Sequence, residues 1–146
     1  MMRARNEMIG AVVVCDDVRL EVGRKHTLVG VFSGDIIVGK LPFTIRLSIW
    51  IEYLPEREGK QDGHFKIRFS DKEPIVLKME IDIHKMGPIA LVIPQFVIRG
   101  EFEGDLTVEF SSDGEVWQEI SKKRILLGKL EPRDGLIPSL PASLGG

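Results

Sequence analysis

The sequence predicts an all-β fold, namely a single antiparallel β-sandwich of the immunoglobulin-like or C2-like type, with about nine short strands and an extended C-terminal tail. Val and Ile together number 29 against only 4 Ala, and β-branched side chains favour pleated strands over helices. Apolar and polar residues alternate through most of the chain, with turn residues about every 8 to 12 positions. Parallel strands would need long helical crossovers, and no segment has a convincing helical pattern.

The strands expected in the first half of the chain follow from this alternation. The clearest strand spans residues 43–53, in which every second side chain is apolar. These apolar residues are Phe43, Ile45, Leu47, Ile49, Ile51 and Tyr53. Trp50 interrupts the polar face, which favours a strand that is covered on both sides. Three shorter strands are expected before it, with turn residues between them, over residues 18–22, 27–32 and 35–38.

Five further strands are expected in the second half, over residues 64–70, 75–83, 88–98, 105–110 and 116–127. Pro94 lacks a backbone N–H, which places its strand at a sheet edge, a bulge or a break. Asp113-Gly114 is the strongest hairpin signal in the sequence. The charged segment 56–63 has no periodicity, so we expect it to be a mobile loop.

The length of 146 residues is typical of one domain with a sizeable core. We expect an N-terminal extension over residues 1–8, the sandwich domain over 9–129 and a Pro/Gly-rich tail over 130–146. Prolines and glycines exclude a central strand or a helix in this tail. Its apolar residues, such as Leu136 and Leu140, would let it dock as an extended peptide.

Charge and cysteine content restrict the partners and the location. With 20 basic and 22 acidic side chains, the formal charge of -2 excludes a strongly basic nucleic-acid or membrane-surface protein. No segment approaches the roughly 20 apolar residues that span a bilayer. Cys15 is the only cysteine, which suits a reducing compartment, so we expect a cytoplasmic protein. The apolar run 8–15 resembles an export leader poorly, because Glu7 interrupts the basic region before it.

The densest polar cluster consists of Asp16, Asp17 and Arg19, just after an apolar strand. An ion pair between Arg19 and a carboxylate is the favoured interpretation. An aspartate that caps backbone N–H groups at a strand-to-turn junction is the structural alternative. Calcium would need about six to eight oxygen ligands, and no second acidic loop has recognisable spacing. The sequence therefore predicts no metal and no cofactor.

No catalytic residue is predicted either. Cys15 is expected to pack as a small hydrophobe, because the two acids after it would raise the pKa of its thiol. The three histidines are too scattered for a zinc motif. An enzyme would require distant residues, such as Cys15, Asp17 and His26, to converge in the folded chain.

Three aromatic residues are candidates for a sugar-stacking surface, namely Trp50, Tyr53 and Trp117. A core or cross-strand position is the favoured interpretation of Trp117, because indole rings usually bury their large area. The segment Ser111-Ser112-Asp113-Gly114 before it faintly resembles an aspartate box, but a plain hairpin explains it.

Two blocks of sequence resemble a bacterial domain family of unknown function. The first block comprises Cys15-Asp16-Asp17-Val18-Arg19-Leu20-Glu21, Gly23-Arg24-Lys25 and Thr27-Leu28-Val29-Gly30-Val31-Phe32. The second comprises Ile98, Gly104 and Leu106-Thr107-Val108. This resemblance implies one compact β-sandwich and supplies no activity and no functional residues.

We therefore expect a non-catalytic interaction or assembly module, as a homo-oligomer or with another protein as its partner. Exposed strand edges and the apolar tail motivate this expectation. The residues selected as a functional surface are Asp16, Asp17, Arg19, Trp50 and Trp117. The alternative is a sandwich that binds a small ligand or a carbohydrate, and an enzyme ranks third.

Overall fold

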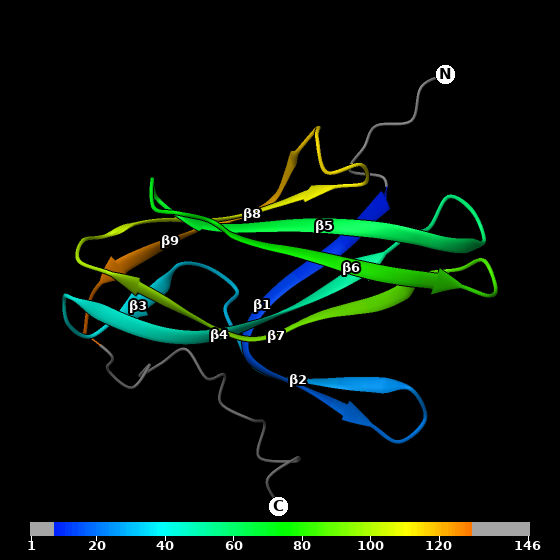
Figure 1. Cartoon of the computed structure of the whole chain (residues 1–146). Helices are drawn as coiled ribbons and strands as arrows, with labels where there is room; N and C mark the ends of the chain where they lie inside the picture. The colour runs from blue at the N-terminus through cyan, green and yellow to red at the C-terminus, as the bar shows by residue number, and fades with distance from the viewer. Residues whose placement is uncertain (1–7, 130–146) are drawn as a thin grey trace, which may run out of the picture.

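Residues 8–129 are the part of the chain that the structure, a computed structural model, describes, and they form nine strands without an α-helix (Figure 1). The strands are β1 (Ile9–Glu21), β2 (Lys25–Val31), β3 (Ile36–Val38), β4 (Phe43–Tyr53), β5 (Gly59–Phe69), β6 (Ile75–Ile83), β7 (Ile89–Gly100), β8 (Gly104–Ser111) and β9 (Gln118–Leu127). The predicted all-β class and the predicted strand number are confirmed.

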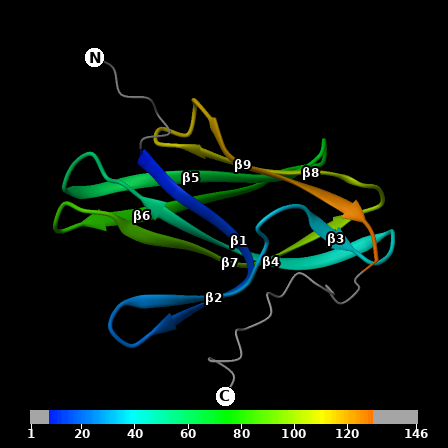
Figure 2. The same cartoon turned by 180° about the vertical axis from the view of Figure 1, so that it is seen from behind.

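The strands form two sheets, which lie one above the other in Figures 1 and 2. The four-stranded sheet has the order β2-β1-β4-β7, and the five-stranded sheet has the order β3-β9-β8-β5-β6. Neighbouring strands are antiparallel except for β3 and β9, which pair in parallel with Ile36 opposite Ile125. The expectation of a purely antiparallel sandwich is wrong at this pair, because most of the domain lies between the two strands and replaces a helical crossover.

The core lies between the two sheets and is filled by alternate side chains of both. Phe43 of β4 meets Phe69 of β5 edge to face, with ring centroids 5.2 Å apart. Tyr53, at the other end of β4, meets Phe110 of β8 at 6.2 Å. All the alternate apolar residues of β4 are buried except Ile45, which is half-buried. The predicted inward face of residues 43–53 is therefore confirmed.

Two predicted element boundaries are wrong. β1 is one strand of 13 residues, so Asp16 and Asp17 lie inside a strand and not at a strand-to-turn junction. β5 begins at Gly59, so most of the segment expected to be a loop is strand. The pairing with β6 accounts for this second difference, because Gly59 lies opposite Ile83, a partner that local alternation does not reveal.

One part of the four-stranded sheet extends beyond the sandwich. β4 pairs with β1 only from Ile9 to Cys15, whereas β2 pairs with β1 from Cys15 to Glu21. Residues 17–29 therefore form a two-stranded hairpin, here called the arm, which stands apart from the other strands in both Figures 1 and 2. Gly23 and Arg24, both with positive φ, turn the chain at its tip.

The predicted N-terminal extension, apart from Met8, and the predicted tail over residues 130–146 lie outside the described residues. The described chain ends beside β3, where the amide of Gly128 donates to the carbonyl of Val38 at 3.0 Å. Within residues 8–129, no helix has the length and apolarity to cross a membrane.

Candidate functional site

The arm has two chemically different faces. Strand alternation places Asp17, Arg19 and Glu21 on one face and Val18 and Leu20 on the other. On β2, Thr27 lies opposite Arg19 on the polar face. Leu28 and His26 lie opposite Val18 and Leu20. The arm is thus an amphipathic two-stranded sheet.

The polar face is held by local contacts. The Arg19 guanidinium lies 3.4 Å from the Asp17 carboxylate, which confirms the expected ion pair. The other oxygen of Asp17 accepts a hydrogen bond of 3.0 Å from the Val18 amide. Thr27 donates a hydrogen bond of 3.0 Å to Glu21 across the hairpin. Because the Arg19 side chain is well exposed, its ion pair contributes about 0 to 1 kcal/mol.

The apolar face of the arm is open. Leu20 is 75% exposed, and Val22 at the tip is 93% exposed. Val18 and Leu20 share a side with Val14, whose side chain is buried in the core. The apolar face therefore continues the core-facing side of the sheet to a place where the five-stranded sheet no longer covers it.

Cys15 lies where the arm joins the sandwich, and its side chain is buried completely. Burial raises the pKa of its thiol, and Asp16 and Asp17 raise it further against a lowering contact with the backbone of Asp17. His26 lies opposite Leu20, five positions along β1 and about 16 Å away at the rise of an extended strand. The three residues that an enzyme would have needed to converge do not do so.

The two tryptophans lie on opposite outer faces of the sandwich. Trp50 stands between buried Ile49 and Ile51 in the four-stranded sheet, so its side chain points away from the core. It is half-buried beside Val13 and Val92 of the neighbouring strands. Its indole nitrogen is enclosed without a hydrogen-bond partner. This aromatic residue belongs to a side of β4 that is partly covered, as expected.

Trp117 covers the outer face of the five-stranded sheet. The Lys66 ammonium lies 4.1 Å from its ring centroid, in a cation–π contact. The His64 ring meets it edge to face at 6.4 Å. Trp117 is half-buried, and Lys66 of β5 occupies one face of its ring. These contacts agree with the expected cross-strand position of Trp117. The structure therefore brings Asp16, Asp17 and Arg19 together on one strand and leaves the tryptophans in two separate places.

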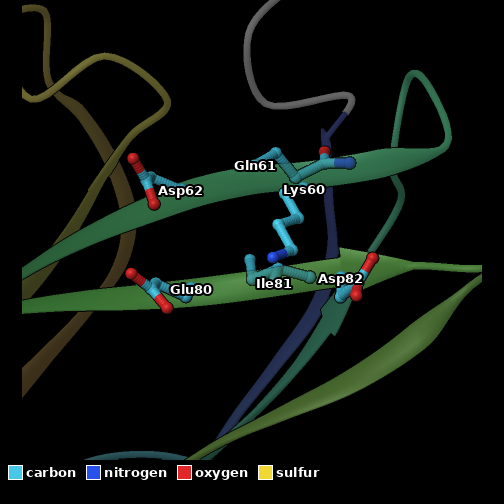
Figure 3. Close-up of a pocket in the computed structure, with 6 residues that line it drawn as sticks. All are labelled: Lys60, Gln61, Asp62, Glu80, Ile81 and Asp82. Carbon is cyan, nitrogen blue, oxygen red and sulfur yellow. The ribbon is translucent and has the colours of Figure 1, made fainter.

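A cavity of about 410 Å³ lies along β5 and β6 (Figure 3). Its lining consists of Lys60, Gln61, Asp62, Glu80, Ile81 and Asp82. Lys60 reaches from β5 toward β6 in Figure 3. Asp62 lies 3.7 Å from the ammonium of Lys78, and Asp82 lies 3.7 Å from His84. Both contacts are exposed and lie on a charged surface.

A second cavity of about 400 Å³ adjoins the first at the start of β5. There Gln61 accepts the hydrogen bond of the Tyr53 hydroxyl and donates to the carbonyl of Arg57 at 2.9 Å. Burial raises the pKa of Tyr53, and the nearby Glu56 adds to the effect. Tyr53 has no exposed surface, so the expectation that its ring could stack on a sugar is wrong.

Metal chemistry has no support in residues 8–129, where no three His, Cys, Asp or Glu side chains gather as a metal site requires. Asp16 is exposed and Asp17 is occupied by Val18 and Arg19. The residues that sequence analysis did not select are the apolar ones of the arm. The alternation of Val18, Leu20 and Val22 was visible, but the exposure of that face depends on where the second sheet ends.

Comparison with known proteins adds little. No protein-family model matches the sequence, and no curated protein matches it. Among solved structures, the chain is similar to a β-glucosidase from Erythrobacter marinus, with 14% identity and a TM-score of 0.34. The match covers 61% of this chain and 14% of the glucosidase chain. A likeness of this size supports no statement about fold or activity.

Proposed function

We propose that this chain is a non-catalytic interaction or assembly module and that the arm is its contact element. The observation that carries the proposal is the open apolar face of the arm, on which Leu20 and Val22 are 75% and 93% exposed. Side chains so exposed add little to folding stability. They gain about 25 cal/mol for each Å² of apolar surface that a partner removes from water.

Two features of the arm support the proposal that a partner covers its apolar face. A hairpin of two strands has marginal stability on its own in water, so a partner that covers it also orders it. On the polar face, Asp17 forms an ion pair with Arg19, and Glu21 accepts a hydrogen bond from Thr27. These side chains stay hydrated when a partner covers the other face. The arm can therefore bind through its apolar face while the charged side chains of its polar face stay hydrated.

The test compares the native chain with the double variant Leu20→Ser with Val22→Ser. Each untagged protein is purified from its own host and weighed under native and denaturing conditions. We expect the native chain to retain further subunits, of its own kind or of another, and the double variant to lose them while its circular dichroism spectrum still shows a folded β domain.

Val76→Ser is the matched control, because Val76 is 58% exposed on the outer strand of the other sheet. This control should retain the native mass. Equal masses for the native chain and the arm variant would refute the role of the arm. A lone native chain with an added small mass would indicate a ligand-binding protein instead.

The finer assignments form part of the same proposal. We assign an immunoglobulin-like or C2-like sandwich type, membership of the uncharacterised bacterial family that residues 15–32 resemble, and a cytoplasmic location. The two-sheet architecture supports the first, and a single buried cysteine suits the last. Carbohydrate binding has weaker support, because Lys66 occupies one face of Trp117 and Tyr53 is buried.

A further inference from the structure

The two sheets have four outer strands, and three of them carry features that block pairing with another chain. β3 has only three residues. The exposed positions of β6 carry charge at Lys78, Glu80 and Asp82. β7 contains Pro94, beside a shift in its register with β4. Short strands, charges, prolines and bulges are the devices by which proteins protect exposed edges.

β2 is the fourth outer strand, and it has little of this protection. Its sequence is Lys-His-Thr-Leu-Val-Gly-Val, without proline or acidic residues, and its one lysine is the first residue. Gly30, with φ of 68°, is its one irregular position. The five residues before it, Lys25 to Val29, keep a constant register with β1.

Three of these five residues direct their backbone groups to the open side. The Phe32 amide donates to the Val14 carbonyl at 2.9 Å, which makes these two residues a hydrogen-bonded pair of the β1–β2 ladder. Such pairs alternate with pairs that exchange no hydrogen bond. Counting back along the register, Lys25, Thr27 and Val29 direct their N–H and C=O groups away from β1. β2 thus offers three successive sets of backbone donors and acceptors.

We infer that a second copy of this chain pairs with this edge, β2 against β2 and antiparallel, around a two-fold axis at Thr27. The inference rests on the proposed function in that the arm is the contact element, and it names a partner for the edge of the arm; this pairing leaves the apolar face of Leu20 and Val22 uncovered. In this register Thr27 lies opposite Thr27 of the other copy, a favourable cross-strand pair. Lys25 lies opposite Val29, and His26 lies opposite Leu28. No like charges face each other.

Charge disfavours the register around Arg19 in which the other open edge of the arm could pair with itself. The segment of β1 beyond Cys15 carries Asp17 and Glu21 on either side of Arg19. Antiparallel self-pairing around Arg19 would place Asp17 of one copy opposite Glu21 of the other, and Arg19 opposite Arg19. Like charges directly opposite each other destabilise a sheet. Pairing through β2 joins two four-stranded sheets into one of eight strands and keeps the apolar faces of both arms on the same side.

The test uses the full chain, with Thr27→Glu and Thr27→Gln as a matched pair. Both variants remove the Thr27 hydroxyl that donates to Glu21, and the two new side chains are the same size. In the Glu variant two negative charges meet at the axis, whereas the Gln variant leaves the axis neutral. Sedimentation equilibrium up to about 100 µM covers the range of a weak interface.

We expect a dimer for the native chain and for Thr27→Gln, and a dimer of Thr27→Glu that is weaker, with a Kd higher by about tenfold. Circular dichroism checks that both variants fold. A monomeric native chain overturns this inference but leaves the arm free to bind another protein, which the Leu20/Val22 variant tests separately. Equal dimerisation of the two Thr27 variants overturns it, and so does a mass that rises beyond the dimer, because that indicates head-to-tail pairing.

Discussion

Gly100 lies where the two sheets meet, and its replacement by alanine tests the described packing. A methyl group there would come within 2.5 Å of Phe43 and 2.6 Å of Phe69, well inside ordinary van der Waals contact. Both rings are buried and packed edge to face at 5.2 Å, so neither can move without disturbing the other. Overpacking of this kind costs about 1 to 3 kcal/mol.

A gain of about 0.4 to 1 kcal/mol from the less flexible unfolded chain offsets part of this cost. The expected net loss for Gly100→Ala is therefore about 1 to 2 kcal/mol, or a melting temperature lower by about 4 to 8 °C. Gly34→Ala is the control, because nothing lies within 4 Å of its added methyl group. Unfolding in urea, followed by circular dichroism, measures both. A Gly100→Ala variant as stable as the native chain would refute the contact between β4, β5 and β7.

Three further predictions concern stability and reactivity. Asp113→Ala should lower the free energy of unfolding in urea by about 1 to 2 kcal/mol. The reason is that the Asp113 carboxylate accepts hydrogen bonds from the amides of Glu115 and Val116 at 2.8 and 3.0 Å. Asp113→Asn should lower it less, because its amide oxygen can still accept. Burial raises the pKa of Cys15 from 9.0 and of Tyr53 from 10.0, so the folded state holds these protons longer than the unfolded state. The contribution of these two groups to stability should be constant below about pH 9 and fall above it, less steeply in Cys15→Ser, as melting temperatures from pH 8 upward would show. Cys15 should resist a thiol reagent in the folded chain and react fully in urea; rapid reaction in buffer would contradict its burial.

Local patterns predicted the strands that have one buried face and short-range partners. The strand over residues 43–53 matches β4 at both ends, because each second side chain enters the core. The parallel pair of β3 and β9 could not be predicted, since Ile36 and Ile125 lie far apart in sequence and period-two alternation is the same for both strand directions. The start of β5 depends on its pairing with β6, in which Gly59 lies opposite Ile83, 24 positions along the chain.

The sequence predicted only those features of the candidate site that depend on residues close together in the chain. The ion pair of Asp17 and Arg19 joins residues two positions apart on one strand face, so spacing was sufficient to propose it. The separation of Trp50 and Trp117 follows from strand order, which no local signal encodes. The exposure of Leu20 likewise follows from the place where the second sheet ends.

Amide hydrogen exchange at low and high protein concentration distinguishes association through the arm from association through another strand. Protection should increase with concentration on the arm, residues 17–29, and most of all between Lys25 and Val29 of β2. Exchange in β3, β6 and β7, the other outer strands, should stay constant. Concentration-dependent protection in those strands, with an unchanged arm, would contradict the account.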